Sequence, residues 1–481
     1  MPSIKKNFFY SSILTSANYI FPFLTYPYVS RVLGVTNIGI CNFIDSIINY
    51  FILFSMMGIG VIGVREIARC KDVQERSKVF SGLLALNTIS TTIILVILIV
   101  AIYAVPKLCE YKELMYIGAL KLVCNYLLVE WLYKGLEDFK FITIRTIIIK
   151  VAYVISVFIF IRNADDYPVY YLLLTLMVVV NAMVNILYAR KFVTFTLKGL
   201  TIRPFIKSFL ILGGYMLLTS MYTSFNVTYL GFVSGETEVG YYTTATKLYS
   251  ILLALYTAFT SVLMPRMSAL VTNGEWEKFR VLLKKSIHIL LALSMPLIIF
   301  AVIMSPQIIE LISGDGYEGA IIPMRITMPL MLVIGFEQIL IIQTLMPLKG
   351  DKIILRNSIL GALIGISMNV LLVKELQSIG SACVWVISEL TILISAQWFL
   401  SKKYNMHFPF RLVCARILQN FPLAVLLFVF SKIPWYSFVL LVVTLGITFV
   451  YSFILQFYII KDEMFLVQYR NIIRRLTHKQ I

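Results

Sequence analysis

The stretch VFSGLLALNTISTTIILVILIVAIYAV, residues 79–105, decides the fold class of this chain. It contains no charged residue and exceeds the roughly 20 apolar residues that an α-helix needs to cross a bilayer. The rest of the chain has the same character, because 59% of its 481 residues are hydrophobic, 14% are charged and the mean hydropathy is +0.87. Such a chain has too little polar sequence to cover a globular surface in water. We therefore expect an all-α membrane protein, since a helix satisfies its own backbone hydrogen bonds in lipid.

Fourteen segments of the chain are long and apolar enough to be read as membrane spans, which predicts a polytopic protein with short polar connections. They lie near residues 8–29, 38–63, 79–105, 114–133, 139–161, 168–189, 205–232, 238–264, 281–304, 319–346, 353–373, 378–400, 412–431 and 435–460.

The basic residues alternate between the connections in a way that predicts the orientation. Of the 42 Lys and Arg residues, 31 lie in the N-terminus, the even-numbered connections and the tail, and six lie in the other connections. Lys and Arg are enriched on the cytoplasmic side of membrane proteins, so both termini are expected to be cytoplasmic. The formal charge of +18 is then a determinant of topology, and we do not expect nucleic acid as a partner.

The chain is expected to divide at the basic connection 191–204. This division predicts a six-helix lobe at 1–190, a second at 205–400, and two additional helices with a basic tail at 401–481. A weak internal repeat agrees with it, since LGVTNIGICNF before the second span resembles LGFVSGETEVGYY before the eighth. Gly39 and Gly240 fall in register, as do Arg65 and Arg266. The repeat indicates either a duplicated transporter plan or a chance match of short glycine-containing strings.

Nine charged residues lie in the spans away from the connections and need an explanation, because an intramembrane charge costs at least about 2.5 kcal/mol unless it meets a partner or a water-filled cavity. One interpretation is a cationic cavity for a phosphate-bearing substrate, and the other is internal salt bridges or snorkelling to an interface. Asp45 and Glu389 are deep enough to bind a coupling proton or cation, or to pair with a buried lysine. Glu130 lies near the cytoplasmic surface and is expected to be solvated. The basic residues are Lys121, Arg145, Lys150, Lys247 and Arg325; the acidic ones are Asp45, Glu130, Glu337 and Glu389.

No motif for catalysis, metal binding or nucleotide binding is visible. The six cysteines form no CxxC pair, the three histidines are isolated, and the chain has neither a P-loop nor a dinucleotide fingerprint. We expect no cofactor, no metal and no enzymatic activity.

Several motifs resemble one family of transporters. They are TYPYVSRVLGVTNIG, VREIARCKD, VGYYTTATKLYSILLAL with TSVLMPRMS, YEGAIIPMRI, QTLMPLKGDK and GSACVWVISE. In order and spacing, from about residue 7 to residue 400, they resemble the polysaccharide-transport flippases that export O-antigen and exopolysaccharide repeat units. This family is a branch of the superfamily that also holds multidrug antiporters and the lipid II flippase. The last two spans match it by hydropathy only.

The resemblance implies two six-helix lobes that open alternately to each side of the bacterial cytoplasmic membrane. Their cargo would be undecaprenyl-pyrophosphate-linked oligosaccharide, and the polymerase and glycosyltransferases of the same pathway would be potential partners. The basic residues listed above would offset the pyrophosphate charge. The sugars need polar groups, and the candidates for sugar contact are Tyr241, Tyr242, Thr243 and Thr244. The alternative interpretation is that these four side chains pack between helices.

Two alternatives stay open. A cation-coupled multidrug antiporter of the same superfamily should prefer acidic residues in its cavity. A membrane polymerase or ligase acting on the same lipid should have a sizeable catalytic loop outside the bilayer, whereas the external connections here are short.

Overall fold

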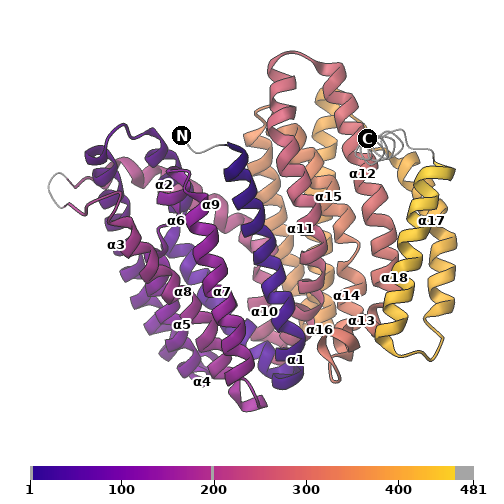
Figure 1. Ribbon diagram of the computed structural model, residues 1–481, viewed down its shortest axis with the longest axis horizontal. Helices are drawn as coiled ribbons and strands as arrows, with labels where there is room; N and C mark the ends of the chain where they lie inside the picture. The colour runs from indigo at the N-terminus through magenta and orange to yellow at the C-terminus, as the bar shows by residue number, and fades with distance from the viewer. Residues whose placement is uncertain (1–3, 197–199, 461–481) are drawn as a thin grey trace, which may run out of the picture. The chain divides into compact units, whose positions relative to one another are not determined.

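The computed structural model describes residues 4–196 and 200–460. Every regular element in these ranges is helical, and no strand occurs in them (Figure 1). Within the described ranges, eleven helices are long and apolar enough to cross a membrane. The protein is therefore a polytopic all-α membrane protein, as the sequence predicts.

The eleven helices are consistent with fourteen spans, because two of them contain a reversal point. The helical stretch Phe9–Arg69 covers the first two predicted spans and has a non-helical residue at Gly34 (φ 75°, ψ 169°). Likewise Asp351–Tyr404 covers the eleventh and twelfth spans and breaks at Gln377 (φ 51°, ψ −127°). Both breaks fall in predicted connections. The eighth span, 238–264, lies on a separate 37-residue helix, α11.

The chain forms two compact units, residues 1–243 and 244–481. The seventh span belongs to the first unit, since α9 and α10 pack on α1. This division lies beyond the predicted lobe boundary at 191–204, which stays a prediction. The first unit contains α1 (Ile4–Met56), α2 (Ile59–Arg69), α3 (Val73–Ala104), α4 (Pro106–Glu110), α5 (Lys112–Asn125), η1 (Tyr126–Leu128), α6 (Glu130–Gly135), α7 (Phe139–Phe160), η2 (Ala164–Asp166), α8 (Tyr167–Ala189), α9 (Arg203–Thr223), α10 (Phe225–Ser234) and the first residues of α11 (Glu236–Thr272).

The connections between consecutive spans of the first unit lie alternately at its two ends, as the number of predicted spans requires. At one end Asn7 is bonded to Glu137 of the fourth connection, and the backbone amide of Thr194 in the sixth donates to Ser77 at the start of α3. At the other end different contacts join the odd-numbered connections. These contacts are the hydrogen bond from Asn37 to the Ala164 carbonyl and the ion pair between Lys107 and Glu236.

Two glycines let α1 and the start of α11 approach backbone to backbone. A Cβ on Gly39 would lie 1.7 Å from the carbonyl oxygen of Glu236, and one on Gly240 would lie 2.3 Å from the carbonyl oxygen of Val35. These two contacts are reciprocal, because each glycine meets the carbonyl four positions before the other. Any side chain here would force the helices apart.

The flanking contacts follow the same register. The hydroxyls of Thr36 and Thr237 lie 2.9 Å apart, and Asn42 donates to the Thr243 hydroxyl over 2.9 Å. Both pairs are separated by 201 residues, the spacing that relates the two glycines. Residues that are in register in the predicted internal repeat thus touch each other within the first unit.

The second unit holds the remaining helices, in which the two C-terminal helices α17 and α18 pack on α12. Its elements after α11 are α12 (Trp276–Ile303), α13 (Ser305–Ser313), η3 (Glu318–Ala320), α14 (Ile321–Thr327), α15 (Leu330–Leu340), η4 (Ile341–Leu345), α16 (Asp351–Tyr404), α17 (Phe410–Phe430), α18 (Ser437–Ile454) and η5 (Leu455–Ile459).

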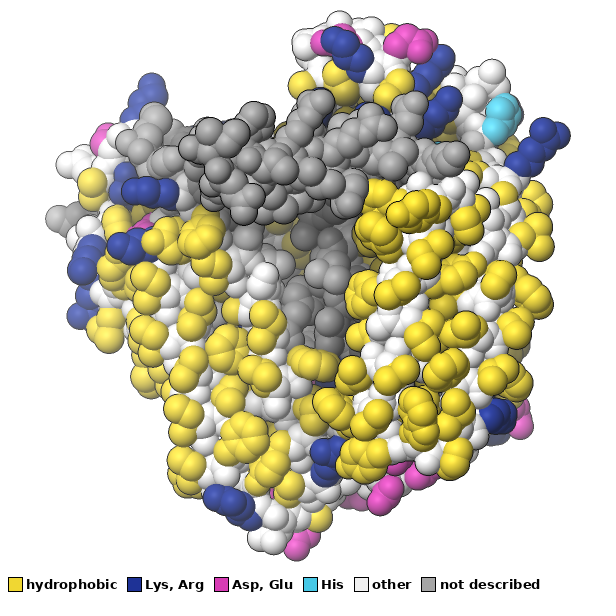
Figure 2. All heavy atoms as spheres, turned by 45° about the vertical axis from the view of Figure 1, so that its right-hand side comes forward, with side chains coloured by type: hydrophobic (Ala, Val, Ile, Leu, Met, Phe, Trp, Pro, Cys, Tyr) yellow, Lys and Arg dark blue, Asp and Glu magenta, His cyan; other side chains and the backbone are white. Residues whose placement is uncertain are grey.

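The outer surface is apolar where the helices are exposed. On the face drawn in Figure 2, hydrophobic side chains cover the helices and charged side chains gather toward the upper and lower edges. Helix α3 shows the pattern in detail, since an exposed stripe recurs along one side of it at helical spacing. Its members are Ile89, Ile93, Val96, Ile97 and Val100. Such a stripe faces lipid.

Candidate functional site

A polar stripe runs along the second half of α1, inside an otherwise apolar helix. Asn42, Asp45, Ser46 and Asn49 recur at the spacing i, i+3, i+4 and i+7, so they share one face of the helix. At 1.5 Å per residue, Asp45 lies about 16 Å along the helix from the break at Gly34. The stripe therefore lies well inside the membrane-spanning segment.

This stripe forms one wall of a pocket of about 410 Å³ in the first unit. Helices α9 and α10 and the residue between them supply other lining side chains, and α11 contributes Thr243. The volume falls in the range of small-molecule binding sites, and most lining side chains carry a hydroxyl, an amide or a carboxylate. The lining residues are Asn42, Asp45, Ser46, Asn49, Tyr50, Leu53, Ser220, Thr223, Ser224, Val227 and Thr243.

The charge in the pocket wall is compensated from α5. Lys121 Nζ lies 2.5 Å from Asp45 Oδ1 and 3.3 Å from Asn49 Oδ1. Asn49 in turn donates to Asp45 Oδ2 over 3.0 Å. The three side chains form a closed network, and a lysine paired with a carboxylate leaves no net charge on this wall.

Hydrogen bonds between helices fix the pocket walls in place. The hydroxyls of Ser46 and Thr228 are 2.9 Å apart, and the Tyr50 hydroxyl donates to the Ser220 carbonyl over 2.9 Å. Each bond joins the α1 face to α10 or α9. The donors and acceptors of the stripe are thereby held in set directions before any ligand binds.

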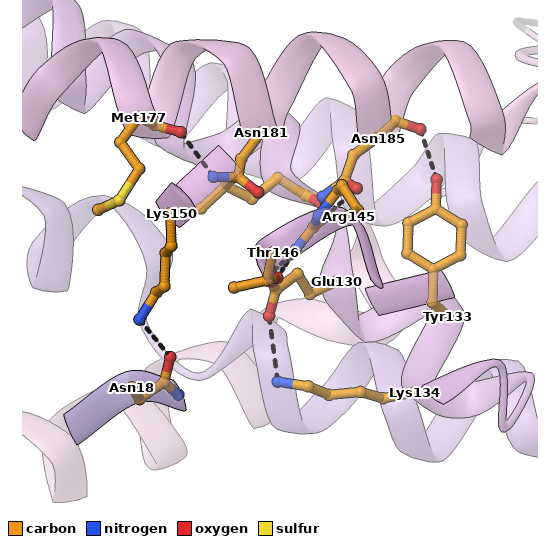
Figure 3. Close-up of polar contacts among 11 residues, drawn as sticks. Asn18, Glu130, Tyr133, Lys134, Arg145, Thr146, Lys150, Met177, Asn181 and Asn185 are labelled. Carbon is orange, nitrogen blue, oxygen red and sulfur yellow. Dashed lines mark hydrogen bonds and ion pairs between the residues drawn. The ribbon is translucent and has the colours of Figure 1, made fainter. Parts of the chain in front are cut away.

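Arg145 belongs to a separate buried network formed by α6, α7 and α8 (Figure 3). Its side chain is 4% exposed and lies 2.7 Å from Glu130 Oε1, which marks it as the partner of an internal ion pair. Arg145 also donates to Asn185 Oδ1 and, over 3.0 Å, to the Thr146 hydroxyl. Glu130 additionally contacts Lys134 at 3.3 Å.

Lys150 has a different environment, although it lies on α7 little more than one turn beyond Arg145. Figure 3 shows its side chain extending away from the Arg145 network toward Asn18 of α1. Its Nζ lies 2.8 Å from Asn18 Oδ1 and 3.5 Å from the Ala17 carbonyl oxygen. Both partners are neutral, so Lys150 is a half-buried cation held by neutral groups rather than by a carboxylate.

The remaining predicted residues are spread over several places. Arg325 Nε donates to the Ser305 hydroxyl over 2.8 Å and to the Val302 carbonyl over 3.2 Å, at the end of α12 and the start of α13. Lys247 is half-buried on α11. Glu389 is 4% exposed on α16.

Of the four predicted sugar contacts, Thr243 lines the pocket. Tyr242 and Thr244 are buried, and Tyr241 is half-buried on the same helix. The Tyr242 hydroxyl lies 3.4 Å from Asn226 Nδ2 of α10.

Sequence reasoning missed most of the pocket. It selected Asp45 and Thr243 but not Asn42, Ser46 or Asn49. The signal was present in the spacing of the α1 stripe, because four polar residues on one face of a membrane span indicate a wet surface or a helix contact. The facing residues on α9 and α10 are ordinary Ser and Thr positions, and no linear pattern distinguishes them.

Comparison with known proteins now adds to this geometry. The family model described as "Polysaccharide biosynthesis protein" matches residues 4–271, which is more than half of the chain. The chain belongs to this family. The matched range includes every residue that lines the pocket.

Two curated relatives cover most of the chain. One from Escherichia coli (strain K12), named "Putative O-antigen transporter", is 25% identical over 72% of this chain and 84% of its own length. Another of the same name from Shigella dysenteriae is 27% identical over 75% of this chain and 91% of its own length.

Solved structures share the fold at low sequence identity. The lipid II flippase MurJ in an inward closed conformation aligns over 94% of this chain and 99% of its own, with a TM-score of 0.74 and 14% identity. An inward-facing multidrug resistance transporter of the MATE family aligns over 79% of this chain and 94% of its own, with a TM-score of 0.63 and 17% identity. The chain therefore shares the polytopic fold of these two transporters.

Proposed function

We propose that this protein is a flippase, not an enzyme, and that it translocates lipid-linked oligosaccharide repeat units by alternating access. The cargo would be an undecaprenyl-pyrophosphate-linked oligosaccharide destined for O-antigen, capsule or exopolysaccharide. The membrane would be the bacterial cytoplasmic membrane, with both termini on the cytoplasmic side, as the charge alternation predicts. A polymerase and glycosyltransferases of the same pathway would use or supply the cargo.

The polar pocket of the first unit carries this proposal. Amides and hydroxyls in a membrane span are costly unless they meet partners, and here they line about 410 Å³ of space. A sugar presents many hydroxyls that both donate and accept, and the Asn, Ser and Thr side chains of the wall match that chemistry. The sugar part of the cargo would occupy this pocket during its passage.

Lys150 supports the anionic part of the cargo. Among the described residues the partners of Lys150 are Asn18 and a backbone carbonyl, and a cation in a membrane span held by such neutral groups keeps much of its attraction for an anion. A pyrophosphate oxygen can accept a charge-assisted hydrogen bond from the Lys150 ammonium group. Lys121 and Arg145 are less suited to this role, since each already pairs with a carboxylate.

The antiporter alternative finds less support in the same pocket. A site for cationic drugs needs uncompensated negative charge, whereas Asp45 is paired with Lys121 at 2.5 Å. The wall therefore offers hydrogen bonds without a net field, which favours a neutral sugar over a cation.

The test is a translocation assay in vesicles that contain the purified protein and an undecaprenyl-pyrophosphate-linked oligosaccharide. A membrane-impermeant glycosidase measures how fast sugar from the inner leaflet becomes accessible. We expect Asn49→Ala and Thr223→Ala to slow this rate about tenfold each, because one hydrogen bond to cargo contributes roughly 1 kcal/mol or slightly more. Lys150→Gln should slow it further.

The matched control is Thr88→Ala, which removes an exposed hydroxyl of α3 that bonds only its own helix at the Leu84 carbonyl. This variant should translocate at the wild-type rate. A wild-type rate equal to that of protein-free vesicles would reject the flippase assignment. Wild-type rates in the Asn49 and Thr223 variants would reject the pocket as the sugar site.

A further inference from the structure

A second open pocket, of about 520 Å³, lies between α7 and α8 of the first unit. It shares no lining residue with the polar pocket, and its volume falls in the range of small-molecule binding sites. Its apolar part is lined by Ile144, Ile148 and Ile149 of α7 and by Val184 of α8. Ile144 is 44% exposed and Ile148 is 62% exposed. Because exposed apolar side chains in a membrane span contact lipid, this part of the pocket opens to the bilayer.

One end of this α7–α8 pocket is aromatic and basic. Phe141 and Tyr188 stack there, with ring centroids 3.7 Å apart and an angle of 16° between the planes. The Nζ atom of Lys191 lies 4.8 Å from the centre of the Tyr188 ring. Lys140, in the first turn of α7, lines the same end, and both lysines are exposed. The two helices thus each bring one accessible cation to the mouth of the pocket.

The carboxylates near this end are directed at other groups. Asp138 Oδ1 accepts a hydrogen bond from the Phe141 amide over 3.2 Å, and Oδ2 accepts one from the Tyr188 hydroxyl over 3.1 Å. Glu137 is bonded to Asn7 of α1.

Basic groups therefore dominate the field at this end. In the described part of the chain, neither Lys140 nor Lys191 belongs to an ion pair. Arg145 adds positive charge at the inner wall, since its partner Glu130 is shared with Lys134 and two cations face that one carboxylate. A ligand that reaches this end from the bilayer meets two exposed ammonium groups, which attract an anion.

We propose that the α7–α8 pocket binds one molecule of an anionic glycerophospholipid. Its phosphate accepts charge-assisted hydrogen bonds from Lys140 and Lys191. One acyl chain lies along Ile144, Ile148 and Val184, which removes apolar surface of both partners from looser contacts with the bilayer. The site goes beyond the proposed function, because it needs neither the cargo nor its translocation.

The length of the pocket selects a phospholipid over the much longer polyprenyl chain of the proposed cargo. From Lys140 to Ile149, α7 rises about 14 Å. This is roughly half of the 30 Å hydrocarbon core, or one leaflet, which is the depth that an acyl chain of a glycerophospholipid occupies. Lys150, the cation suited to the cargo pyrophosphate, extends toward Asn18 of α1 and does not line this pocket.

The test is native mass spectrometry of the purified full-length protein in detergent, titrated with phosphatidylglycerol. The ratio of lipid-bound to free protein gives the dissociation constant of the first lipid. We expect phosphatidylglycerol to bind at least about fivefold more tightly than phosphatidylcholine with the same acyl chains, because only the former headgroup carries a net negative charge. Lys140→Gln and Lys191→Gln should each weaken the binding of phosphatidylglycerol about fivefold.

Two further variants separate the pocket from a general effect of charge. Ile148→Trp fills the apolar part at an exposed position and should weaken binding although both lysines remain. Lys432→Gln is the matched control, since Lys432 Nζ also lies over an aromatic ring, 5.3 Å from the centre of Phe428, but outside the pocket. This variant should bind phosphatidylglycerol like the wild type. Melting temperatures measured without added lipid show whether each variant is folded.

The proposal is overturned if phosphatidylglycerol and phosphatidylcholine bind equally well, which would make the pocket an unselective contact with bulk lipid. Unchanged dissociation constants in both lysine variants would also reject it. The same holds if undecaprenyl phosphate at equal concentration displaces phosphatidylglycerol, because the pocket would then belong to the path of the cargo. None of these measurements requires translocation, so a failed flippase assay and a failed lipid site remain separate findings.

Discussion

At the scale of single residues, depth in the membrane does not determine the role of a charge. Arg145 and Lys150 lie on the same helix, and the sequence offered both as cavity cations. Arg145 is bound into a network with Glu130 and Asn185, whereas the partners that the structure describes for Lys150 are neutral. The interpretation as an internal salt bridge therefore fits Arg145 better, and the cavity interpretation fits Lys150 better.

Arg145→Met should destabilise the protein by about 3 kcal/mol, because it leaves Glu130 without its closest partner in a largely buried network. Thermal unfolding of the purified protein measures this as a lower melting temperature. Lys134→Ala is the control, since the Lys134 side chain is 43% exposed and its contact with Glu130 should contribute less than about 1 kcal/mol. A second change, Glu130→Gln, should partly restore the Arg145→Met variant. Equal stability of Arg145→Met and Lys134→Ala would contradict the assignment.

At the scale of elements, the crossing of α1 and α11 brings Thr243 to the pocket wall. Gly39 and Gly240 permit the close approach, and the bond from Asn42 to Thr243 forms directly beside it. Thr243 reaches the pocket wall because the two helices touch at the glycines. The two glycines therefore serve the packing of α1 on α11, and this packing also sets the position of Thr243 in the candidate site.

Gly39→Ala should lower stability by about 1–3 kcal/mol or more, because the new methyl group would lie 1.7 Å from a backbone oxygen that cannot rotate away. Gly60→Ala on α2 is the matched control. No atom lies within 4 Å of its Cβ position, so stability should stay constant or rise slightly. Melting temperatures of the two variants provide the comparison. If both variants melt like the wild type, the close crossing does not exist in solution.

At the scale of the whole molecule, the charge alternation predicts which ends of the helices face the cytoplasm. Single cysteines in a cysteine-free background at positions 70 and 403 should react with an impermeant thiol reagent only after permeabilisation. A cysteine at position 315 should react in intact spheroplasts. The side chains of Lys403 and Asp315 are exposed and Cys70 is partly so, hence reagent access is set by the membrane. Labelling in the reverse order would invert the topology.

The sequence by itself determined the fold class and the positions of the spans, because apolar length is a local property that each segment carries alone. It also placed the breaks at Gly34 and Gln377 within predicted connections. Only the tertiary structure decided which polar side chains meet. Asp45 and Lys121 are 76 residues apart in the chain, and Arg145 and Asn185 are 40 residues apart. Such pairing depends on which helix faces are in contact, and a single sequence carries no linear signal for that.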